Sequence, residues 1–155
     1  HRVFAEADWA GALADAATFD PNVVVEEFIS GRELTVGIVN GQALPVIEIR
    51  APDGWYDYRA KYTKGQTEYL VPAPIDEVAS RLCQKLATQT FQALGCRGFA
   101  RVDIRMTESG EAYVLELNNI PGFTETSLLQ KAAARLGLSF AELCDRIMET
   151  AAYGT

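Results

Sequence analysis

The sequence predicts an α+β fold in which helices back an antiparallel sheet. Two hairpin patterns indicate antiparallel strands, one turning at Asn40-Gly41 and the other around Ser109-Gly110. The predicted elements follow in the order helix, strands, loop, helix, hairpin, helices, which fits such a sheet best. With 155 residues, 48% of them hydrophobic, the chain is long enough to form a well-packed core.

The N-terminal third is expected to contain one helix, one buried strand and one hairpin. The alanine-rich residues Glu6–Phe19 favour a helix, which Asp20-Pro21-Asn22 would end. Val23–Ile29 begins with three consecutive valines and lacks helical periodicity, so it is predicted to be a buried strand. Glu33–Val39 and Gln42–Ile49 flank the Asn-Gly turn and are expected to pair with each other.

The middle of the chain is expected to hold one irregular segment and one helix. Residues 51–70, with their Asp, Gly, Trp, Tyr and Lys residues, form the irregular segment. Residues 76–94 show helical periodicity, and Gly95 is a typical C-terminal stop. The apolar residues at this spacing are Val78, Leu82, Leu86, Phe91 and Leu94.

The second hairpin contains the most informative pattern of the chain. Phe99–Arg105 and Ala112–Asn119 each alternate apolar and polar residues, which is typical of strands with one packed face. If Ser109-Gly110 is a two-residue loop, Asp103 lies directly opposite Glu116 on the same face of the sheet. Two opposed carboxylates repel each other, so this arrangement calls for a compensating cation.

The same register places Arg101 opposite Asn118, and this pair suggests two interpretations of the face. Oxygen ligands such as Asp, Glu and Asn suit Mg²⁺ or Mn²⁺, and Mg²⁺ usually shares its ligands with substrate phosphates. A magnesium–nucleotide site is therefore one interpretation. The other is a solvated face on which Arg101 and Arg105 neutralise the acids. Arg101 itself would either pair with those carboxylates or neutralise an oxyanion or a transferring phosphoryl group.

The chain after Asn118 favours the site interpretation. Pro121-Gly122 breaks the strand, and residues 124–127 offer N-caps for a following helix. A strand end with metal ligands, a glycine turn and a helix N-terminus together make an anion-binding corner. The last helix is expected to start at Ser139, which forms a capping box with Glu142.

Composition narrows the classes of partner. The chain has 14 Lys and Arg against 21 Asp and Glu, a formal net charge of −7, which argues against nucleic-acid or membrane-surface binding. Cys83, Cys96 and Cys144 are widely spaced, so we expect reduced core thiols in a cytoplasmic protein. No apolar run reaches the roughly 20 residues needed to span a bilayer. The single histidine, His1, is a poor catalytic candidate.

Two further segments offer binding chemistry. Glu26 and Glu27 precede the apolar pair Phe28-Ile29, and Glu33 follows; this edge would bind a purine and its ribose hydroxyls, or its acids are simply solvated. Residues 55–62 form a long aromatic loop with Lys61 and Tyr62. The loop would close over a phosphate, or be pinned by aromatic packing with the lysine in solvent.

Four motifs in this order resemble the D-alanine–D-alanine ligases of the ATP-grasp superfamily. They are VEEFISGRELTVGI at 25–38, YDYRAKY at 56–62, GFARVD at 98–103 and LELNNIPGFTETSL at 115–128. The resemblance covers nearly the whole chain and implies that it is a fragment, with residues 1–26 the tail of the central domain and 27–155 the C-terminal domain. It implies a cytoplasmic enzyme of peptidoglycan synthesis, commonly a homodimer, that binds ATP and two Mg²⁺ or Mn²⁺ ions.

The resemblance also assigns roles to individual residues. Metal binding falls to Asp103, Glu116 and Asn118. Contacts with ATP fall to Glu26, Glu27, Phe28, Ile29, Glu33, Trp55 and Lys61, with Tyr62 beside the last in the closing loop. Contacts with the acyl phosphate or the second D-alanine fall to Arg101, Gly122 and Ser127. Asn119-Ile120 departs from the family pattern, which changes the turn and spares the ligands.

The implied reaction has two steps. The carboxylate of the first D-alanine attacks the γ-phosphate of ATP, and the amine of the second D-alanine then attacks the acyl phosphate. The 155 residues alone are expected to be inactive, because the first-substrate domain, the phosphate-gripping lysines and the glycine- and serine-rich loop would precede His1. The alternatives are another ATP-grasp carboxylate–amine or depsipeptide ligase, and a non-catalytic nucleotide-binding module. The pair Lys61-Tyr62 favours an amine over lactate as second substrate.

Overall fold

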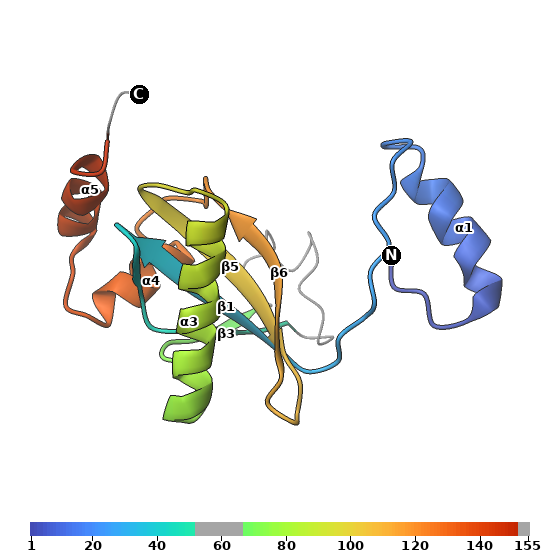
Figure 1. Ribbon diagram of the computed structural model, residues 1–155, viewed down its shortest axis with the longest axis horizontal. Helices are drawn as coiled ribbons and strands as arrows, with labels where there is room; N and C mark the ends of the chain where they lie inside the picture. Colours follow the sequence, from blue (N-terminus) through green and yellow to red (C-terminus); the bar gives the residue numbers. More distant parts are fainter. Residues whose placement is uncertain (52–66, 152–155) are drawn as a thin grey trace.

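The structure is a computed structural model that describes residues 1–51 and 67–151. An antiparallel six-stranded sheet forms its centre, in the order β4-β3-β1-β5-β6 with β2 paired to the end of β1 (Figure 1). Its strands are β1 (Arg32–Val39), β2 (Gln42–Ala43), β3 (Ile47–Arg50), β4 (Glu68–Leu70), β5 (Phe99–Met106) and β6 (Ala112–Asn118). The helices are α1 (Glu6–Ala16), α3 (Glu77–Ala93), α4 (Leu128–Ala134) and α5 (Phe140–Met148). The predicted α+β class, an antiparallel sheet with helices against it, is confirmed.

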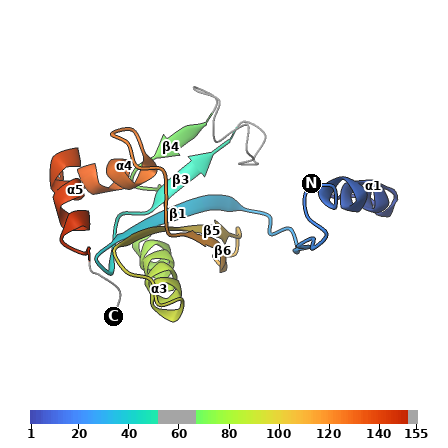
Figure 2. The ribbon, with the colours of Figure 1, turned by 90° about the horizontal axis from the view of Figure 1, so that it is seen from above.

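Helices cover both faces of the sheet, but to different extents. Figure 2 shows α3 against one face and α4 and α5 against the other, while α1 stands apart from the sheet. The core under α3 combines Leu34, Val36, Ile38, Val102 and Ile104 of the sheet with Cys83, Ala87 and Phe91 of the helix. The second core joins Val39 and Ile47 to Leu129 of α4 and Leu143 of α5. Because α4 and α5 lie toward one end of the sheet, they leave part of the sheet face opposite α3 uncovered.

Helix α3 buries a side that differs from its most apolar sequence positions. Its start and end are as predicted: the Asp76 side chain accepts a hydrogen bond from the backbone N–H of Ala79, and Gly95 follows with φ of +64°. The buried residues are Cys83, Ala87 and Phe91, whereas Val78 is 73% exposed and Leu94 is 64% exposed. Small side chains at two of the three buried positions let the helix lie close to the sheet.

The predicted buried strand over Val23–Ile29 is wrong. The segment has no regular secondary structure, and Val24 is 82% exposed. A buried strand needs neighbours for its backbone groups, and within residues 1–51 and 67–151 no strand pairs with this segment. The irregular segment 51–70 also needs correction, because Glu68–Leu70 forms strand β4 against β3. A strand of three residues is too short for alternation to reveal it.

The first hairpin turns where predicted, but its second arm is divided. Asn40 and Gly41 have φ of 50° and 74°, the positive pair that a type I′ turn requires. Gln42–Ala43 and Ile47–Arg50 then form separate strands, and Pro45 between them lacks the N–H that a continuous ladder would need. Both strands still pair with β1, in registers that differ by one residue.

The second hairpin reaches its predicted pairing by a different route. The backbone N–H of Gly110 donates to the carbonyl of Thr107, and that of Thr107 to the carbonyl of Glu111, so the loop has three residues instead of the predicted two. If the pairing set by this three-residue loop continued unchanged along the strands, Leu115 would lie opposite Asp103. A β-bulge next to Asp103 then adds one residue to β6, and Asp103 pairs with Glu116 as predicted.

An ion-pair network ties β1 to β3 on the face that α3 covers. Glu48 accepts hydrogen bonds from Nε and Nη2 of Arg32, both at 2.8 Å, and pairs with Arg50 at 3.0 Å. Burial acts to raise the pKa of Glu48, but the hydrogen bonds from the two arginines outweigh it and lower the pKa. The hydrogen bond with Glu48 correspondingly raises the pKa of Arg32.

Only one of the three predicted core thiols is fully buried. All three cysteines are unpaired, and Cys83 is buried under the sheet, where burial raises the pKa of its thiol to about 11. None of the helices in residues 1–51 and 67–151 has the length and apolar character needed to cross a membrane.

Candidate functional site

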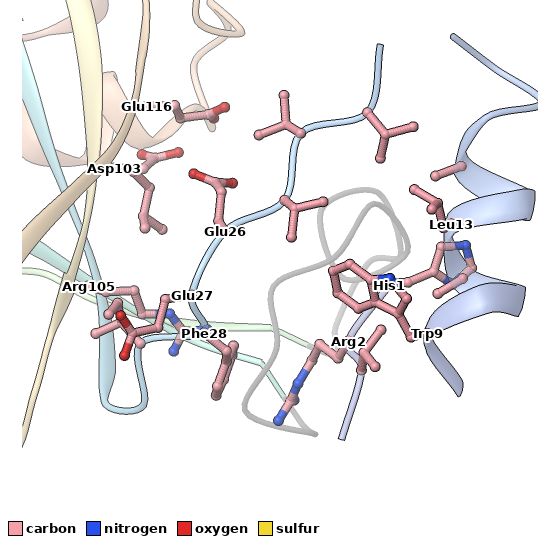
Figure 3. A pocket seen from close by; sticks show the side chains of 18 of the residues that line it. His1, Arg2, Trp9, Leu13, Glu26, Glu27, Phe28, Asp103, Arg105 and Glu116 are labelled. Carbon is pink, nitrogen blue, oxygen red and sulfur yellow. The ribbon is translucent and has the colours of Figure 1, made fainter. Parts of the chain in front are cut away.

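A cavity of about 560 Å³ lies between the N-terminal segment and the open part of the sheet (Figure 3). Residues 1–3, helix α1 and residues 23–29 line one side, which we call the N-terminal wall, and β1, β5 and β6 line the other. Seven residues predicted for the site line it: Glu26, Glu27, Phe28, Ile29, Glu33, Asp103 and Glu116. In Figure 3 the side chains of Glu26, Asp103 and Glu116 point into the same part of the cavity. The structure thus brings together two motifs that lie far apart in the sequence.

Strand pairing explains why one sheet face carries so much charge. In β5, Val102 and Ile104 point into the core under α3, so Arg101, Asp103 and Arg105 point to the opposite face. Their partners share that face. On β1, Glu33 lies opposite Arg105 and Thr35 opposite Asp103; on β6, Glu116 lies opposite Asp103 and Asn118 opposite Arg101.

Asp103 is the best-anchored carboxylate of this face. Arg101 donates to it twice, from Nε to Oδ1 and from Nη2 to Oδ2, both at 2.9 Å. The hydroxyl of Thr35 donates to Oδ1 at 2.6 Å. Because Asp103 is only 4% exposed and Thr35 1% exposed, these bonds hold the carboxylate in one orientation.

The donor set around Asp103 fits a hard divalent cation. A carboxylate offers about four lone-pair positions, and residues of the described part take three of them, leaving one on Oδ2. Glu116 across the ladder supplies a second carboxylate, and Asn118, two residues further along β6 on the same face, supplies an amide oxygen. Oxygen donors of this kind suit Mg²⁺ or Mn²⁺. Within residues 1–51 and 67–151 there is no group of three or more His, Cys, Asp or Glu that could hold a metal, so a metal site here would also have to use the amide oxygen of Asn118.

Arg105 connects strand β5 to the N-terminal wall of the cavity. Its Nη1 donates to the carbonyl of Gly31 at 2.9 Å, and its Nη2 lies 3.2 Å from Oε2 of Glu33. Its guanidinium carbon lies 5.5 Å from the ring centre of Phe28, and that of Arg2 lies 4.4 Å from the same ring. Phe28 is therefore held between two arginines, as Figure 3 shows.

The other predicted residues lie outside the cavity lining. Arg101 and Asn118 form the next pair on the same face of β5 and β6, and the Asn118 side chain accepts from the backbone N–H of Ile120 at 3.0 Å. Gly122 is exposed in the turn that follows. Ser127 is the N-cap of α4, and its hydroxyl accepts from the backbone N–H of Gln130 at 3.3 Å. Trp55, Lys61 and Tyr62 lie outside the described residues.

Helix α4 packs on the sheet next to Arg101. Gly37 of β1 lies opposite Arg101, and a Cβ at Gly37 would lie 2.6 Å from Cδ1 of Leu129. The missing side chain therefore lets Leu129 pack directly on β1. This contact fixes the start of α4, and with it Ser127, over the sheet.

Sequence reasoning missed Thr35, and it assigned Arg105 to the acids of this face in general without finding its contacts with Glu33 and Gly31. Alternation alone could have placed Thr35 on the same face as Glu33, two residues earlier, and Arg105 on the same face as Asp103. Alternation does not reveal which residues of β1 and β5 face each other, because these strands are far apart in the chain and no short loop sets their register. The partners of both side chains became visible only in the structure.

Comparison with known proteins agrees with this architecture. The family model described as "D-ala D-ala ligase C-terminus" matches residues 1–149. A D-alanine–D-alanine ligase of Syntrophotalea carbinolica is 51% identical over 143 residues, covering 92% of this chain and 47% of that protein. One from Methylacidiphilum infernorum is 47% identical over 138 residues, covering 89% of this chain and 46% of that protein. The chain spans about half the length of the curated relatives it matches.

Solved structures show the same similarity in three dimensions. The D-alanine–D-alanine ligase of Bacillus anthracis matches with a TM-score of 0.82 and 34% identity, over 96% of this chain and 48% of that one. The VanG D-Ala:D-Ser ligase of Enterococcus faecalis matches with a TM-score of 0.84 and 35% identity, over 95% of this chain and 44% of that one.

Fold and comparisons together define the class, an α+β domain of the ATP-grasp type. The chain belongs to the D-alanine–D-alanine ligase family, of which it represents the C-terminal region.

Proposed function

We propose that this chain provides the C-terminal part of an ATP-dependent ligase that joins two D-alanine molecules for peptidoglycan synthesis. One observation carries the proposal: Glu26, the Phe28-Ile29 pair and Glu33 line the same cavity as Asp103 and Glu116. An apolar edge with nearby glutamates suits a nucleoside, and opposed carboxylates suit the metal that accompanies its phosphates.

The names of the relatives support the same reading. The curated relatives are named D-alanine–D-alanine ligases, and a further Bacillus anthracis structure of such a ligase, 30% identical, is described as complexed with ATP. Because the chain spans about half of these proteins, the activity, the substrates and the partners of the whole enzyme remain part of the proposal.

In this proposal the N-terminal wall of the cavity holds the nucleoside. Glu26, Phe28 and Ile29, with Glu27 beside them, would form the adenine edge, and Glu33 would accept from the ribose hydroxyls. Trp55 would stack near the nucleotide. Lys61 and Tyr62 would belong to the loop that closes over the phosphates.

In the same proposal, the side of the cavity formed by the sheet holds the metal ions and the triphosphate. Asp103, Glu116 and Asn118 would bind two Mg²⁺ or Mn²⁺ ions, which supply charge neutralisation for the triphosphate when bound. Arg101 already lies against Asp103, so its guanidinium would bring positive charge to the same place.

The remaining predicted residues serve the second step. Once the carboxylate of the first D-alanine has attacked the γ-phosphate and displaced ADP, the amine of the second attacks the carbonyl carbon of the acyl phosphate. Phosphate leaves, the amine nitrogen loses a proton, and the peptide bond is formed. Arg101 and the backbone N–H of Gly122 would stabilise the negative charge that develops on the acyl oxygen. Ser127, fixed at the start of α4, would contact the second substrate.

A ligase with a different second substrate is the other candidate function. The similarity to a D-Ala:D-Ser ligase, at 35% identity, makes D-serine the first competitor to test. Lys61-Tyr62 favours an amine nucleophile over the hydroxyl of lactate, so a depsipeptide product is disfavoured.

The organisation of the full protein belongs to the same proposal. Residues 1–26 would be the tail of the central domain and 27–155 the C-terminal domain. The enzyme would act in the cytoplasm, as a homodimer in its full-length form.

The test is phosphate release from Mg-ATP, measured with D-alanine added and withheld, with mass analysis of the product. The intact protein that carries these residues should release phosphate only with D-alanine and form the D-alanyl dipeptide, and Asp103→Asn should abolish turnover. The 155 residues alone should be inactive or nearly so. Turnover that is independent of D-alanine, or a product containing D-serine or lactate when all three are offered, would contradict the proposed substrate.

A further inference from the structure

Arg105 is a buried charge that takes no part in the proposed reaction steps. It is 4% exposed, and it lies on β5 two residues after Asp103. A buried guanidinium requires partners for its charge. Three of those partners lie on one short stretch of chain, residues 28–33, which joins the N-terminal wall of the cavity to β1.

These three contacts act at different points of that stretch. The hydrogen bond to the Gly31 carbonyl, at 2.9 Å, fixes the backbone just before β1. The contact with the Phe28 ring, at 5.5 Å, fixes the apolar edge. The ion pair with Glu33, at 3.2 Å, holds its Oε2 on the face that lines the cavity. One side chain thus sets the distance between the proposed metal ligands and the proposed nucleoside edge.

We propose that Arg105 is a positioning residue for the nucleotide, because it orients the Glu33 carboxylate toward the ribose hydroxyls. This inference rests on the proposed function and deepens it. An unrestrained glutamate has three rotatable side-chain bonds and would lose that freedom on binding. Arg105 restrains the side chain before the nucleotide arrives, so less binding energy is spent on ordering it.

The test compares two nucleotides that differ only in the ribose hydroxyls. Calorimetric Kd values for ATP and for 2′,3′-dideoxy-ATP are measured with MgCl₂ and without D-alanine, on the intact protein that carries these residues. The variants are Arg105→Met, Arg105→Lys and Glu33→Gln. Arg81→Met is the matched control, since Arg81 also pairs with a carboxylate, Glu77 at 3.0 Å, but lies on the exposed side of α3.

The unaltered protein should bind ATP about 10-fold or more tightly than the dideoxy nucleotide, the scale expected for hydrogen bonds to a charged group. Arg105→Met should remove most of this preference, and it should weaken binding of the dideoxy nucleotide by a smaller factor than binding of ATP, because Arg105 also contacts Phe28 and Gly31 beside the proposed adenine edge. Arg105→Lys, which keeps the charge but not the planar fork, should retain part of the preference. Glu33→Gln should lose part or all of it, and Arg81→Met should keep it.

A purely structural role for Arg105 predicts a different pattern. Arg105→Met would then weaken both nucleotides equally, or leave the preference intact, and either result overturns the inference while the proposed function stands. Failure of the unaltered protein to bind ATP at all would overturn both. If Arg105→Met shows no cooperative thermal unfolding, Arg105→Lys decides, and an undiminished ribose preference in that variant overturns the inference.

Discussion

Replacing Gly31 by alanine should destabilise the fold more than the same replacement at a glycine in an open turn. Gly31 joins the N-terminal wall of the cavity to β1 with φ of +143°, a value that L side chains rarely adopt. A Cβ at this position would lie 2.1 Å from the carbonyl oxygen of Met106 and 2.9 Å from Cα of Thr107. These contacts are with the backbone at the end of β5, which cannot move aside by changing a rotamer.

Three costs add up in Gly31→Ala. The sparsely populated backbone conformation costs about 1–3 kcal/mol, and overpacking against fixed atoms costs about 1–3 kcal/mol. Relief of the clash requires the start of β1 to move away from β5, which would stretch the hydrogen bond from Arg105 to the Gly31 carbonyl. We therefore expect the free energy of unfolding to fall by about 3 kcal/mol or more.

Gly110→Ala separates the conformational cost from the steric one. Gly110 has φ of +88°, but a Cβ there would meet nothing within 4 Å, so only the conformational cost of about 1–2 kcal/mol applies. Urea unfolding followed by circular dichroism gives both values. Equal losses for the two variants would show that the close approach of Gly31 to Met106 does not constrain the fold.

Three more predictions concern titration, reactivity and capping. Since the pKa of Glu48 is lowered in the folded state, its stabilising contribution is present above its ordinary pKa of 4.5 and is lost as the pH falls through the lowered value. Glu48→Gln should therefore flatten the acid side of the curve of unfolding free energy against pH, and an unchanged curve would contradict this. Cys83 has a pKa of about 11 and no exposed area, so in the folded protein it should resist iodoacetamide at pH near 8. The partly buried Cys96 and Cys144 should react, and mass spectrometry counts the labels. Ser139→Ala removes the capping box of α5 and should lower the melting temperature by a few degrees, with Thr at the same position restoring it.

The hairpin of β5 and β6 shows how a site can be predicted correctly from an incomplete argument. Alternation correctly identified the two strands and the face that carries Asp103. The assumed two-residue loop was wrong, and the three-residue loop alone would have placed Leu115 opposite Asp103. The bulge in β6 compensates for it, so Glu116 occupies the predicted position. Bulges have no clear sequence pattern in a strand of mixed residues, which is why this one was not foreseen.

The N-terminal wall of the cavity shows what a local sequence pattern cannot predict. Three valines at residues 23–25 correctly indicate a segment without helical structure, but they do not reveal whether a strand lies alongside it. The cavity presented the same difficulty. The residues of each wall were predicted separately. The two walls come together because β1 pairs with β5, where Thr35 contacts Asp103, 68 positions further along the chain. Arg105 was expected to neutralise acids of this face, but Glu33 could not be identified as its partner until that pairing was known.

The pairing itself is fixed by the opposite face of the same strands. Leu34 and Val36 of β1, like Val102 and Ile104 of β5, are fully buried under α3, and successive residues alternate between this core and the cavity. A slip of one residue in β5 would turn Asp103 into the apolar core and expose Val102 and Ile104 to the cavity. Burying an unpaired carboxylate in this way costs several kcal/mol, in addition to the apolar area lost. The apolar core therefore sets the register that places Asp103 opposite Glu116 and Arg105 opposite Glu33, and a core substitution that weakens the register should impair the site without touching it.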